Sequence, residues 1–208
     1  MPAASDQLVF YGHPRSGNAY KVALMLALTG APHRFELVDL NAGKQHTPEH
    51  LKISRFSQVP ALVHGEIKIA QSNAILLYLA ELTGKFAASG TAQKYAVLEW
   101  MMWEQDVLFT GVGRTRFLTK VVKGDPGAIA FLRKLGERGL GVLETRLGES
   151  PYLAGAAPTV ADIAVYSYAR LAEEAGYDLG GQPKILAWRK SIEALPGWAP
   201  PATLMPIA

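Results

Sequence analysis

The most informative segment of this chain is VPALVHGEIKIAQS, which runs from Val59 to Ser72. Apolar residues on both sides of the polar residues 64–66 predict two short strands joined by a tight turn. Proline cannot donate a hydrogen bond to a sheet, so we expect Pro60 at the start or at the edge of the first strand. A cis bond before Pro60 would leave the main chain of Val59 free to pair with a bound peptide, whereas a trans bond is the commoner form.

The same segment ends where a helix is expected to begin. The pair Gln71-Ser72 precedes the apolar run Ala74–Leu79, and we expect Ser72 to cap this helix at its N-terminus. Amide groups at the start of a helix point outward and favour an anion. An extended edge and an anion site therefore lie close together in this prediction, which suits a small acidic peptide.

Composition narrows the class of protein. The 208 residues are 49% hydrophobic and 19% charged, which is typical of a globular chain with a sizeable core. No apolar run reaches the roughly 18 residues that cross a bilayer, and the first six residues lack the pattern of a signal peptide. We therefore expect a cytoplasmic protein without membrane contact. The net charge of +3 is small and its Lys and Arg residues are dispersed, which argues against nucleic-acid binding.

The chain has no cysteine, which removes disulfides and zinc–thiolate sites. Any sulfur chemistry must then use a sulfur atom that arrives with a ligand. Four of the five histidines, at positions 13, 33, 50 and 64, lack the spacing of metal ligands, and we expect them in exposed loops or turns. No metal is predicted.

The first part of the chain alternates strands and helices. Leu8–Tyr11 and Phe35–Leu40 read as strands, separated by a helix that begins at Ser16 or Asn18 and ends at Gly30. A connection of this length predicts parallel neighbouring strands with a right-handed crossover.

From residue 92 onward only helical patterns occur. We therefore predict an α/β domain over residues 1–84, a linker over residues 85–91 and an all-helical domain over residues 92–208. Gly111 and Gly113 are expected to interrupt the first long helix. Thr159 and Asp162 are spaced to form a reciprocal capping box at a later helix, with Asp in the position usually held by Glu.

In this order and at these distances, four features resemble the cytosolic glutathione S-transferases in one of their bacterial forms. They are the strand-loop-helix with residues 16–22, the segment 59–62, the Gln71-Ser72 pair and the capping box at residues 159–162. The resemblance covers nearly the whole chain. It implies the glutathione S-transferase fold, which is an α/β thioredoxin-like N-terminal domain followed by an all-α C-terminal domain, and it implies a homodimer.

The resemblance also implies where glutathione, the co-substrate, would bind. Val59, next to a cis Pro60, would hold the cysteinyl backbone, and Gln71 with Ser72 would hold the γ-glutamyl end. The glycyl carboxylate would lie near Lys44, His46 and Gln58.

The thiol of glutathione would have to be held as a thiolate. Ser16 is the first candidate to donate a hydrogen bond to the sulfur. Asn18 is the second, because Ser16-x-Asn18-x-x-Lys21 resembles a nu-class pattern with Ser in place of Thr. Both residues also have a local interpretation as helix-capping residues. A pocket for the electrophile would lie near the glycine break, lined by Trp103, Phe109, Arg114 and Phe117.

The resemblance predicts an enzyme, a glutathione S-transferase that conjugates glutathione to a small hydrophobic electrophile in detoxification. Two alternatives stay open. The first is glutathione-dependent reduction of disulfides or peroxides, which needs no protein cysteine because two glutathione molecules supply both sulfurs. The second is a non-catalytic protein of the same fold that binds ligands or partners.

Overall fold

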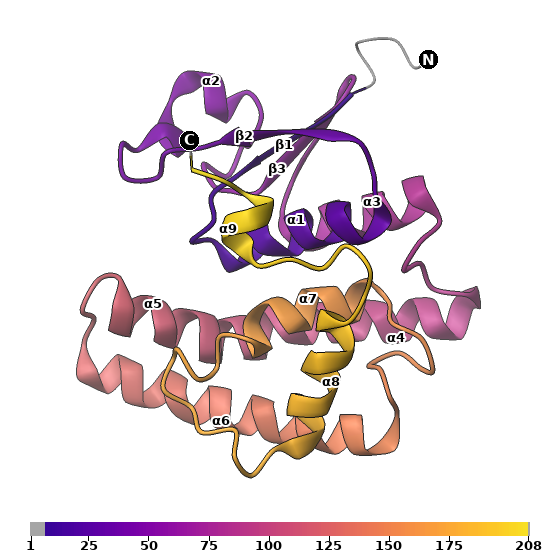
Figure 1. The fold of residues 1–208 in the computed structure, drawn as a ribbon. Helices are drawn as coiled ribbons and strands as arrows, with labels where there is room; N and C mark the ends of the chain where they lie inside the picture. Colours follow the sequence, from indigo (N-terminus) through magenta and orange to yellow (C-terminus); the bar gives the residue numbers. More distant parts are fainter. Residues whose placement is uncertain (1–6, 208) are drawn as a thin grey trace. The chain divides into compact units, whose positions relative to one another are not determined.

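The computed structural model describes residues 7–207, which form two units (Figure 1). Unit 1 combines residues 7–87 with residues 195–207, and unit 2 is Ala88–Ala194. From the sequence, residues 195–207 were assigned to the all-helical domain. In the structure they pack within unit 1 instead. There the Tyr20 hydroxyl donates to the Ala199 carbonyl at 2.9 Å. None of the helices in residues 7–207 has the length and apolar character needed to cross a membrane.

Unit 1 is built on a four-stranded sheet with the strand order β2-β1-β3-β4. Its elements are β1 (Leu8–Gly12), α1 (Gly17–Thr29), β2 (His33–Leu37), η2 (Lys44–His46), α2 (Pro48–Leu51), β3 (Ala61–His64), β4 (Ile67–Ala70), α3 (Ser72–Thr83) and α9 (Pro201–Leu204). Strands β1 and β2 are parallel, as predicted, while β3 pairs antiparallel with both β1 and β4. The fold is therefore thioredoxin-like, with a mixed sheet.

The hairpin predicted around residues 64–66 is confirmed, with its turn between β3 and β4. The second strand is displaced from its predicted position: β2 is His33–Leu37 instead of residues 35–40. It starts earlier because His33 pairs in register with Leu8. It also ends earlier, because the Asp39 carboxylate accepts hydrogen bonds from the amides of Asn41 and Ala42 and turns the chain away.

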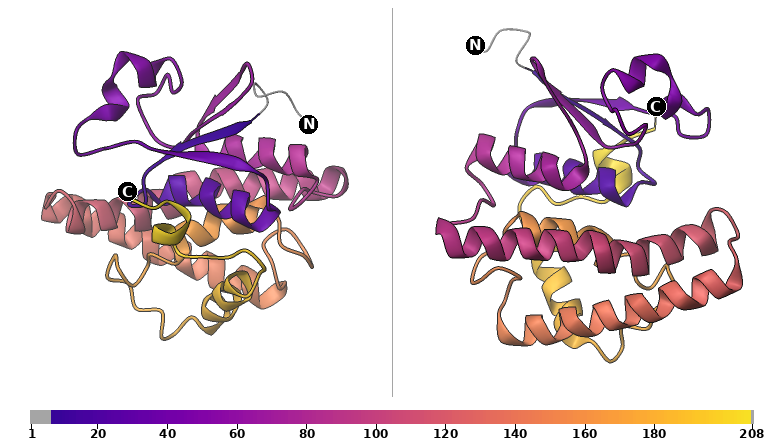
Figure 2. Two further views of the ribbon diagram at one scale, coloured as in Figure 1. Left: turned by 45° about the horizontal axis from the view of Figure 1, so that its top comes forward. Right: turned by 180° about the vertical axis from the view of Figure 1, so that it is seen from behind.

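Helices α1 and α3 lie together on one face of this sheet, and α2 lies on the other side (Figures 1 and 2). Ten of the thirteen residues of α1 are buried, because the helix contacts β1, α3 and α9. The predicted helix stop is confirmed: Gly30 has φ 70°, the left-handed conformation that glycine adopts at helix ends.

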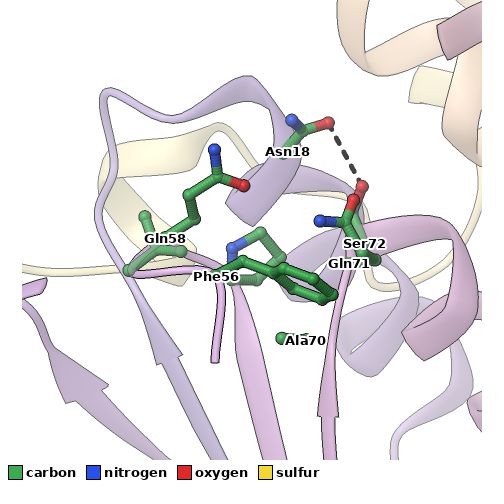
Figure 3. Close-up of a pocket in the computed structure, with 8 residues that line it drawn as sticks. Asn18, Phe56, Gln58, Ala70, Gln71 and Ser72 are labelled. Carbon is green, nitrogen blue, oxygen red and sulfur yellow. Dashed lines mark hydrogen bonds between the residues drawn. The ribbon is translucent and has the colours of Figure 1, made fainter. Parts of the chain in front are cut away.

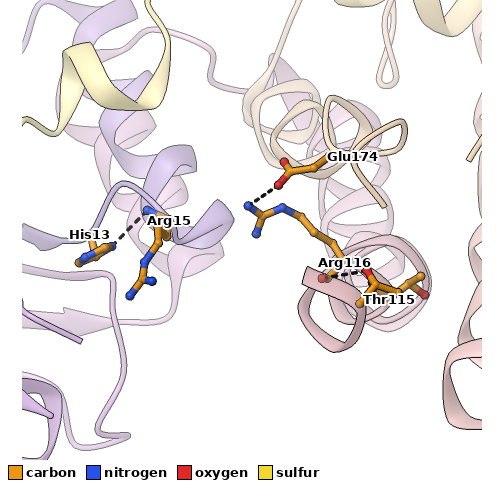
Figure 4. A network of polar contacts seen from close by, with 6 residues as sticks. His13, Arg15, Thr115, Arg116 and Glu174 are labelled. Carbon is orange, nitrogen blue, oxygen red and sulfur yellow. Dashed lines mark hydrogen bonds and ion pairs between the residues drawn. The ribbon is translucent and has the colours of Figure 1, made fainter. Parts of the chain in front are cut away.

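Unit 2 is entirely helical. Its elements are α4 (Gly90–Trp103), the π-helix η3 (Glu104–Gly113), α5 (Arg114–Lys120), α6 (Pro126–Glu149), α7 (Val160–Ala169) and α8 (Pro183–Glu193). An ion pair of 2.8 Å joins Arg116 in α5 to Glu174 beyond the end of α7 (Figure 4). The right-hand view of Figure 2 shows α4, η3 and α5 as one continuous run beside α6.

The expected interruption at Gly111 and Gly113 is wrong, because the chain stays helical through both residues in the wider π form. Close packing explains the glycines. A Cβ on Gly111 would lie 2.5 Å from the backbone of Gly136 in α6, which is far inside van der Waals contact. A Cβ on Gly113 would instead lie 2.6 Å from the Tyr168 ring of α7. Gly111 therefore lets η3 approach α6, Gly113 leaves room for Tyr168, and neither ends the helix.

The capping box at the start of α7 is confirmed. The Asp162 carboxylate is fully buried and accepts four hydrogen bonds: from the Leu153 amide at 3.0 Å, the Trp188 indole at 3.1 Å, and the Thr159 amide and hydroxyl at 2.9 and 3.2 Å. Burial raises the pKa of Asp162, and these donors partly offset the rise. One carboxylate thus connects α7, α8 and the loop before α7.

Candidate functional site

A pocket opens in unit 1 between the N-terminal ends of α1 and α3 and the loop before β3 (Figure 3). It encloses about 220 Å³ of empty space, part of it open to solvent. The residues that line it are Asn18, Phe56, Gln58, Val59, Pro60, Ala70, Gln71 and Ser72. The structure therefore brings together six of the residues predicted from the sequence. It adds two that were not predicted, Phe56 and Ala70.

The turn from β1 to α1 sets the position of the first helix beside this pocket. The Ser16 amide donates to the His13 carbonyl at 2.9 Å, and the Arg15 amide donates to the His13 ring at 3.1 Å (Figure 4). His13 is buried, contrary to the expected exposure. Burial and then the nearby Arg15 charge lower the pKa of His13, which favours the neutral ring that accepts this hydrogen bond.

Ser16 is the N-cap of α1, where its Oγ accepts a hydrogen bond from the Ala19 amide at 3.1 Å. It is not among the residues that line the pocket. Its capping role is therefore supported by geometry, while a contact with a ligand sulfur stays a prediction.

We expect Ser16→Ala to lower the free energy of unfolding by about 1 kcal/mol, because the Ala19 amide loses its acceptor. Its kcat for glutathione conjugation should change by less than about threefold. Urea unfolding and steady-state kinetics measure the two effects. Ser16→Asn, which keeps a capping oxygen, is the control for stability. A loss of kcat on the order of 100-fold in Ser16→Ala would assign the sulfur contact to Ser16 instead.

Asn18 lies one residue inside α1 and faces the pocket. The Ser72 hydroxyl donates to Asn18 Oδ1 at 3.1 Å, which joins α1 to α3 across the pocket wall. Figure 3 shows the oxygen of the Asn18 amide turned toward Ser72 and the nitrogen turned away from it. Since Oδ1 already accepts this hydrogen bond, the Nδ2 group is the donor that Asn18 can offer to a ligand.

The start of α3 forms the opposite wall. The expected N-cap at Ser72 is wrong: Ser72 is the first helical residue, and Gln71 is the N-cap, with its carbonyl accepting from the Ile75 amide at 3.1 Å. Gln71 has φ 96°, a strained conformation for a residue other than glycine. The first amides of α3 have no partner within the helix, so this end of the pocket favours an anion.

The loop before β3 supplies the third wall. The Val59–Pro60 peptide bond is cis, and Pro60 lies just before the first residue of β3. Within residues 7–207 the Val59 main chain makes no hydrogen bond, so its amide and carbonyl stay available to a ligand. His50, expected to be exposed, is instead buried, and its ring contacts the Gln58 carbonyl at 3.1 Å. This contact holds the loop that carries Gln58 and Val59.

Lys44 and His46 do not line the pocket. Both are exposed in the short helix η2. The His46 ring is engaged on both nitrogens, with Ser57 Oγ at 2.6 Å and with the Gln45 side chain at 2.9 Å. Their contact with a glycyl carboxylate stays a prediction.

The four residues predicted for an electrophile pocket lie in unit 2. Phe109 packs on Tyr168 with ring centroids 5.1 Å apart, and the Arg114 guanidinium lies over the Phe109 ring at 5.3 Å. Phe117 is half exposed, and Trp103 packs on Trp100. Three of the four thus occupy aromatic clusters, and their role toward an electrophile stays a prediction.

Sequence reasoning missed Phe56 because the loop 54–58 carries no periodic pattern. The available signal was an aromatic residue only a few positions before the Val59–Pro60 pair. In the structure Phe56 is 49% exposed and lines the pocket. Among residues 7–207, no group of three or more His, Asp or Glu side chains could hold a metal ion.

Comparison with known proteins finds relatives along most of the chain. The family profile "Glutathione S-transferase, N-terminal domain" matches residues 6–81, and "Glutathione S-transferase, C-terminal domain" matches residues 126–200. The chain is 33% identical over 187 residues to the "Disulfide-bond oxidoreductase YfcG" of Escherichia coli strain K12, which covers 86% of this chain and 87% of that protein.

Solved structures agree with this result. The crystal structure of a glutathione S-transferase from Pseudomonas fluorescens Pf-5 superimposes with a TM-score of 0.87 at 33% identity, covering 93% of this chain and 98% of that one. A second structure from the same species, a glutathione transferase family member with two glutathione bound, has a TM-score of 0.84 at 27% identity, covering 94% and 92%.

Proposed function

Because this chain belongs to the glutathione S-transferase family, we propose that it binds glutathione in the pocket of unit 1, stabilises its thiolate and transfers it to a small hydrophobic electrophile. The observation that carries this proposal is the juxtaposition, in one pocket, of the free Val59 main chain, the N-terminus of α3 and the Asn18 amide.

Each part of the tripeptide has a matching group in this pocket. The γ-glutamyl carboxylate would take the open amides at the start of α3, where the helix dipole favours negative charge. The cysteinyl backbone would pair in an extended conformation with the amide and carbonyl of Val59, which lies before the start of β3. This arrangement directs the thiol toward the N-terminal end of α1, where Asn18 offers its Nδ2 hydrogens.

Conjugation requires two further steps once glutathione is bound: loss of the thiol proton and attack on the electrophile. A thiol is a weak nucleophile until it loses its proton, and a donor beside the sulfur lowers the thiol pKa. The thiolate then attacks an electrophilic carbon. A carbon–sulfur bond forms, and on a chloronitrobenzene the carbon–chlorine bond breaks with chloride leaving. Holding both reactants side by side supplies much of the remaining acceleration.

A second reaction is favoured by one specific finding, the 33% identity to a protein named a disulfide-bond oxidoreductase. Two glutathione thiols would reduce a disulfide to two thiols and leave as glutathione disulfide. Since the chain has no cysteine, both sulfur atoms must come from glutathione. The solved relative with two glutathione bound is compatible with this chemistry.

Two assays on the full chain test these proposals. We expect saturable conjugation of a chloronitrobenzene, followed by its absorbance, and we compare it with reduction of hydroxyethyl disulfide, followed as glutathione disulfide formed. Reduction without conjugation would replace the first reaction by the second. Glutathione binding in calorimetry with neither activity would leave a non-catalytic binding protein. An absence of glutathione binding would contradict the proposal as a whole. The cytoplasmic location and the homodimer stay predictions.

A further inference from the structure

The π form of η3 determines which of its side chains meet. The Arg114 amide donates to the Phe109 carbonyl, five residues earlier, where an α-helix would use a carbonyl four residues earlier. Side chains five residues apart therefore lie on one side of η3, whereas in an α-helix the neighbours are three or four residues apart. Phe109 and Arg114 are such a pair, and the guanidinium lies 5.3 Å from the centre of the Phe109 ring. The π form thus brings this arginine and this ring together.

Tyr177, in the segment between α7 and α8, binds the main chain of η3. Its hydroxyl donates to the Gly111 carbonyl at 3.0 Å, and its oxygen lies 3.3 Å from Thr115 Oγ1. Burial raises the pKa of Tyr177, so the hydroxyl stays protonated at neutral pH and remains a donor. A carbonyl that accepts a hydrogen bond from outside its helix tilts away from the helix axis, which favours the wider turn. Tyr177 therefore stabilises the π form of η3.

Tyr177 is itself held firmly from α6. The Arg133 guanidinium lies over its ring at 5.2 Å and donates to the carbonyls of Gly176 and Ala175 at 2.8 and 3.1 Å. Gly136 leaves room for the phenol, because a Cβ there would lie 2.2 Å from the hydroxyl oxygen. The donor to η3 thus has a fixed position.

The Arg114 guanidinium is available to a ligand. Arg114 is exposed, and within residues 7–207 its side chain makes no hydrogen bond or ion pair. The nearby Arg116 differs, because it pairs with Glu174 at 2.8 Å (Figure 4). A guanidinium that lies over an aromatic ring still offers the N–H groups at its edge, which match the two oxygens of a carboxylate.

We propose that Tyr177 is a positioning residue: by holding η3 in the π form it keeps Arg114 over Phe109, where the guanidinium selects electrophiles that carry a carboxylate. This inference rests on the proposed function, whose electrophile it assigns to a class. That class is small aromatic compounds with an acidic group, since the cation stands beside an aromatic ring.

Two substrates with the same ring and the same leaving group test this class. The acid 4-chloro-3-nitrobenzoate carries a carboxylate, and its methyl ester does not. Each reaction with glutathione forms a carbon–sulfur bond and releases chloride. In Arg114→Met we expect kcat/KM to fall about tenfold for the acid and less than about twofold for the ester, because only the acid loses a charge-assisted hydrogen bond. Arg138→Met removes another exposed arginine, in α6, and should leave both values unchanged.

Tyr177→Phe tests the positioning role, because it keeps the ring and removes the hydrogen donated to Gly111. We expect the acid-to-ester ratio of kcat/KM to fall about fivefold, while the Kd of glutathione changes less than about twofold. Amide hydrogen exchange within residues 109–115 should become faster, because the segment can then change between the π and α forms. In an Arg114→Met background, Tyr177→Phe should leave the ratio unchanged. A general loss of packing would lower both rates together and would not move the ratio.

Two results would overturn the inference: an acid-to-ester ratio unchanged in Arg114→Met, or one that Tyr177→Phe leaves at the wild-type value. Failure of the proposed function is a separate outcome, seen in the wild type as conjugation of neither compound. In that case calorimetry with 4-chloro-3-nitrobenzoate replaces the kinetics, and Arg114→Met should weaken its binding about tenfold. Equal affinity in wild type and variant, or no binding to the wild type, would overturn the inference.

Discussion

Replacing Asn18 by alanine is expected to lower kcat/KM for glutathione conjugation about 100-fold, which corresponds to about 2.7 kcal/mol of transition-state stabilisation. Asn18 lines the pocket and offers Nδ2 as a donor, because its oxygen already accepts from Ser72. Without this donor the bound thiol holds its proton more tightly, so less thiolate is present at neutral pH. The pH profile of kcat/KM measures the effect. The variant should regain activity as the pH rises toward the thiol pKa in water.

Asn18→Asp is the matched variant. It has nearly the same shape, but a carboxylate cannot donate and its charge repels the thiolate, so we expect a loss at least as large. Both variants keep the Ser16 cap of α1 and should stay folded by circular dichroism. Activity within about threefold of wild type in Asn18→Ala would exclude Asn18 from thiol activation.

Replacing Asp162 by alanine is expected to destabilise the protein by about 3 to 5 kcal/mol. The Asp162 carboxylate accepts four hydrogen bonds in a fully buried position, and its loss leaves the Leu153 amide, the Trp188 indole and the Thr159 amide and hydroxyl without that acceptor. Because the same side chain connects α7 to α8 and to the loop before α7, the loss should affect the folding of unit 2. Urea unfolding followed by tryptophan fluorescence measures it.

Asp162→Asn tests the contributions of the two carboxylate oxygens separately. An asparagine oxygen in the place of Oδ1 still accepts from Leu153 and Trp188, while its nitrogen meets the Thr159 amide, which is also a donor. We therefore expect a smaller loss than in the alanine variant. A change below about 1 kcal/mol in Asp162→Ala would show that water or neighbouring groups replace the carboxylate.

Because the pKa of Asp162 is raised in the folded state, the stability of the protein should depend on pH. Burial raises this pKa above its ordinary value of 3.8, so the folded state binds the proton more tightly than the unfolded state. The stabilisation from this proton is complete below the unfolded pKa and is lost as the pH rises through the folded pKa. The stability of wild type relative to Asp162→Asn should therefore decrease as the pH rises from the ordinary pKa of 3.8 upward. An increase over that range would contradict the direction of the shift.

Local patterns predicted much of the fold because their causes are local. The hairpin of β3 and β4 follows from apolar residues on both sides of a Gly-containing turn, and the capping box of α7 follows from two side chains three residues apart. The displaced β2 and the uninterrupted helix at Gly111 were mispredicted for the opposite reason. The limits of β2 depend on its register with β1. Gly111 is needed because α6 packs close to it, and the sequence of η3 contains no sign of that contact.

The candidate site also has some features that local sequence predicts and others that depend on tertiary packing. By itself the sequence determined that a proline-containing extended segment precedes a helix start, and that any thiol must come from a ligand, because those properties belong to residue types and to their order. Only the tertiary structure showed that Asn18, and not Ser16, is among the residues that line the pocket. Two positions so close along a helix point to different sides of it. Which side meets the pocket is set by the rotation of α1 about its axis, and that rotation is fixed by packing against β1, α3 and α9.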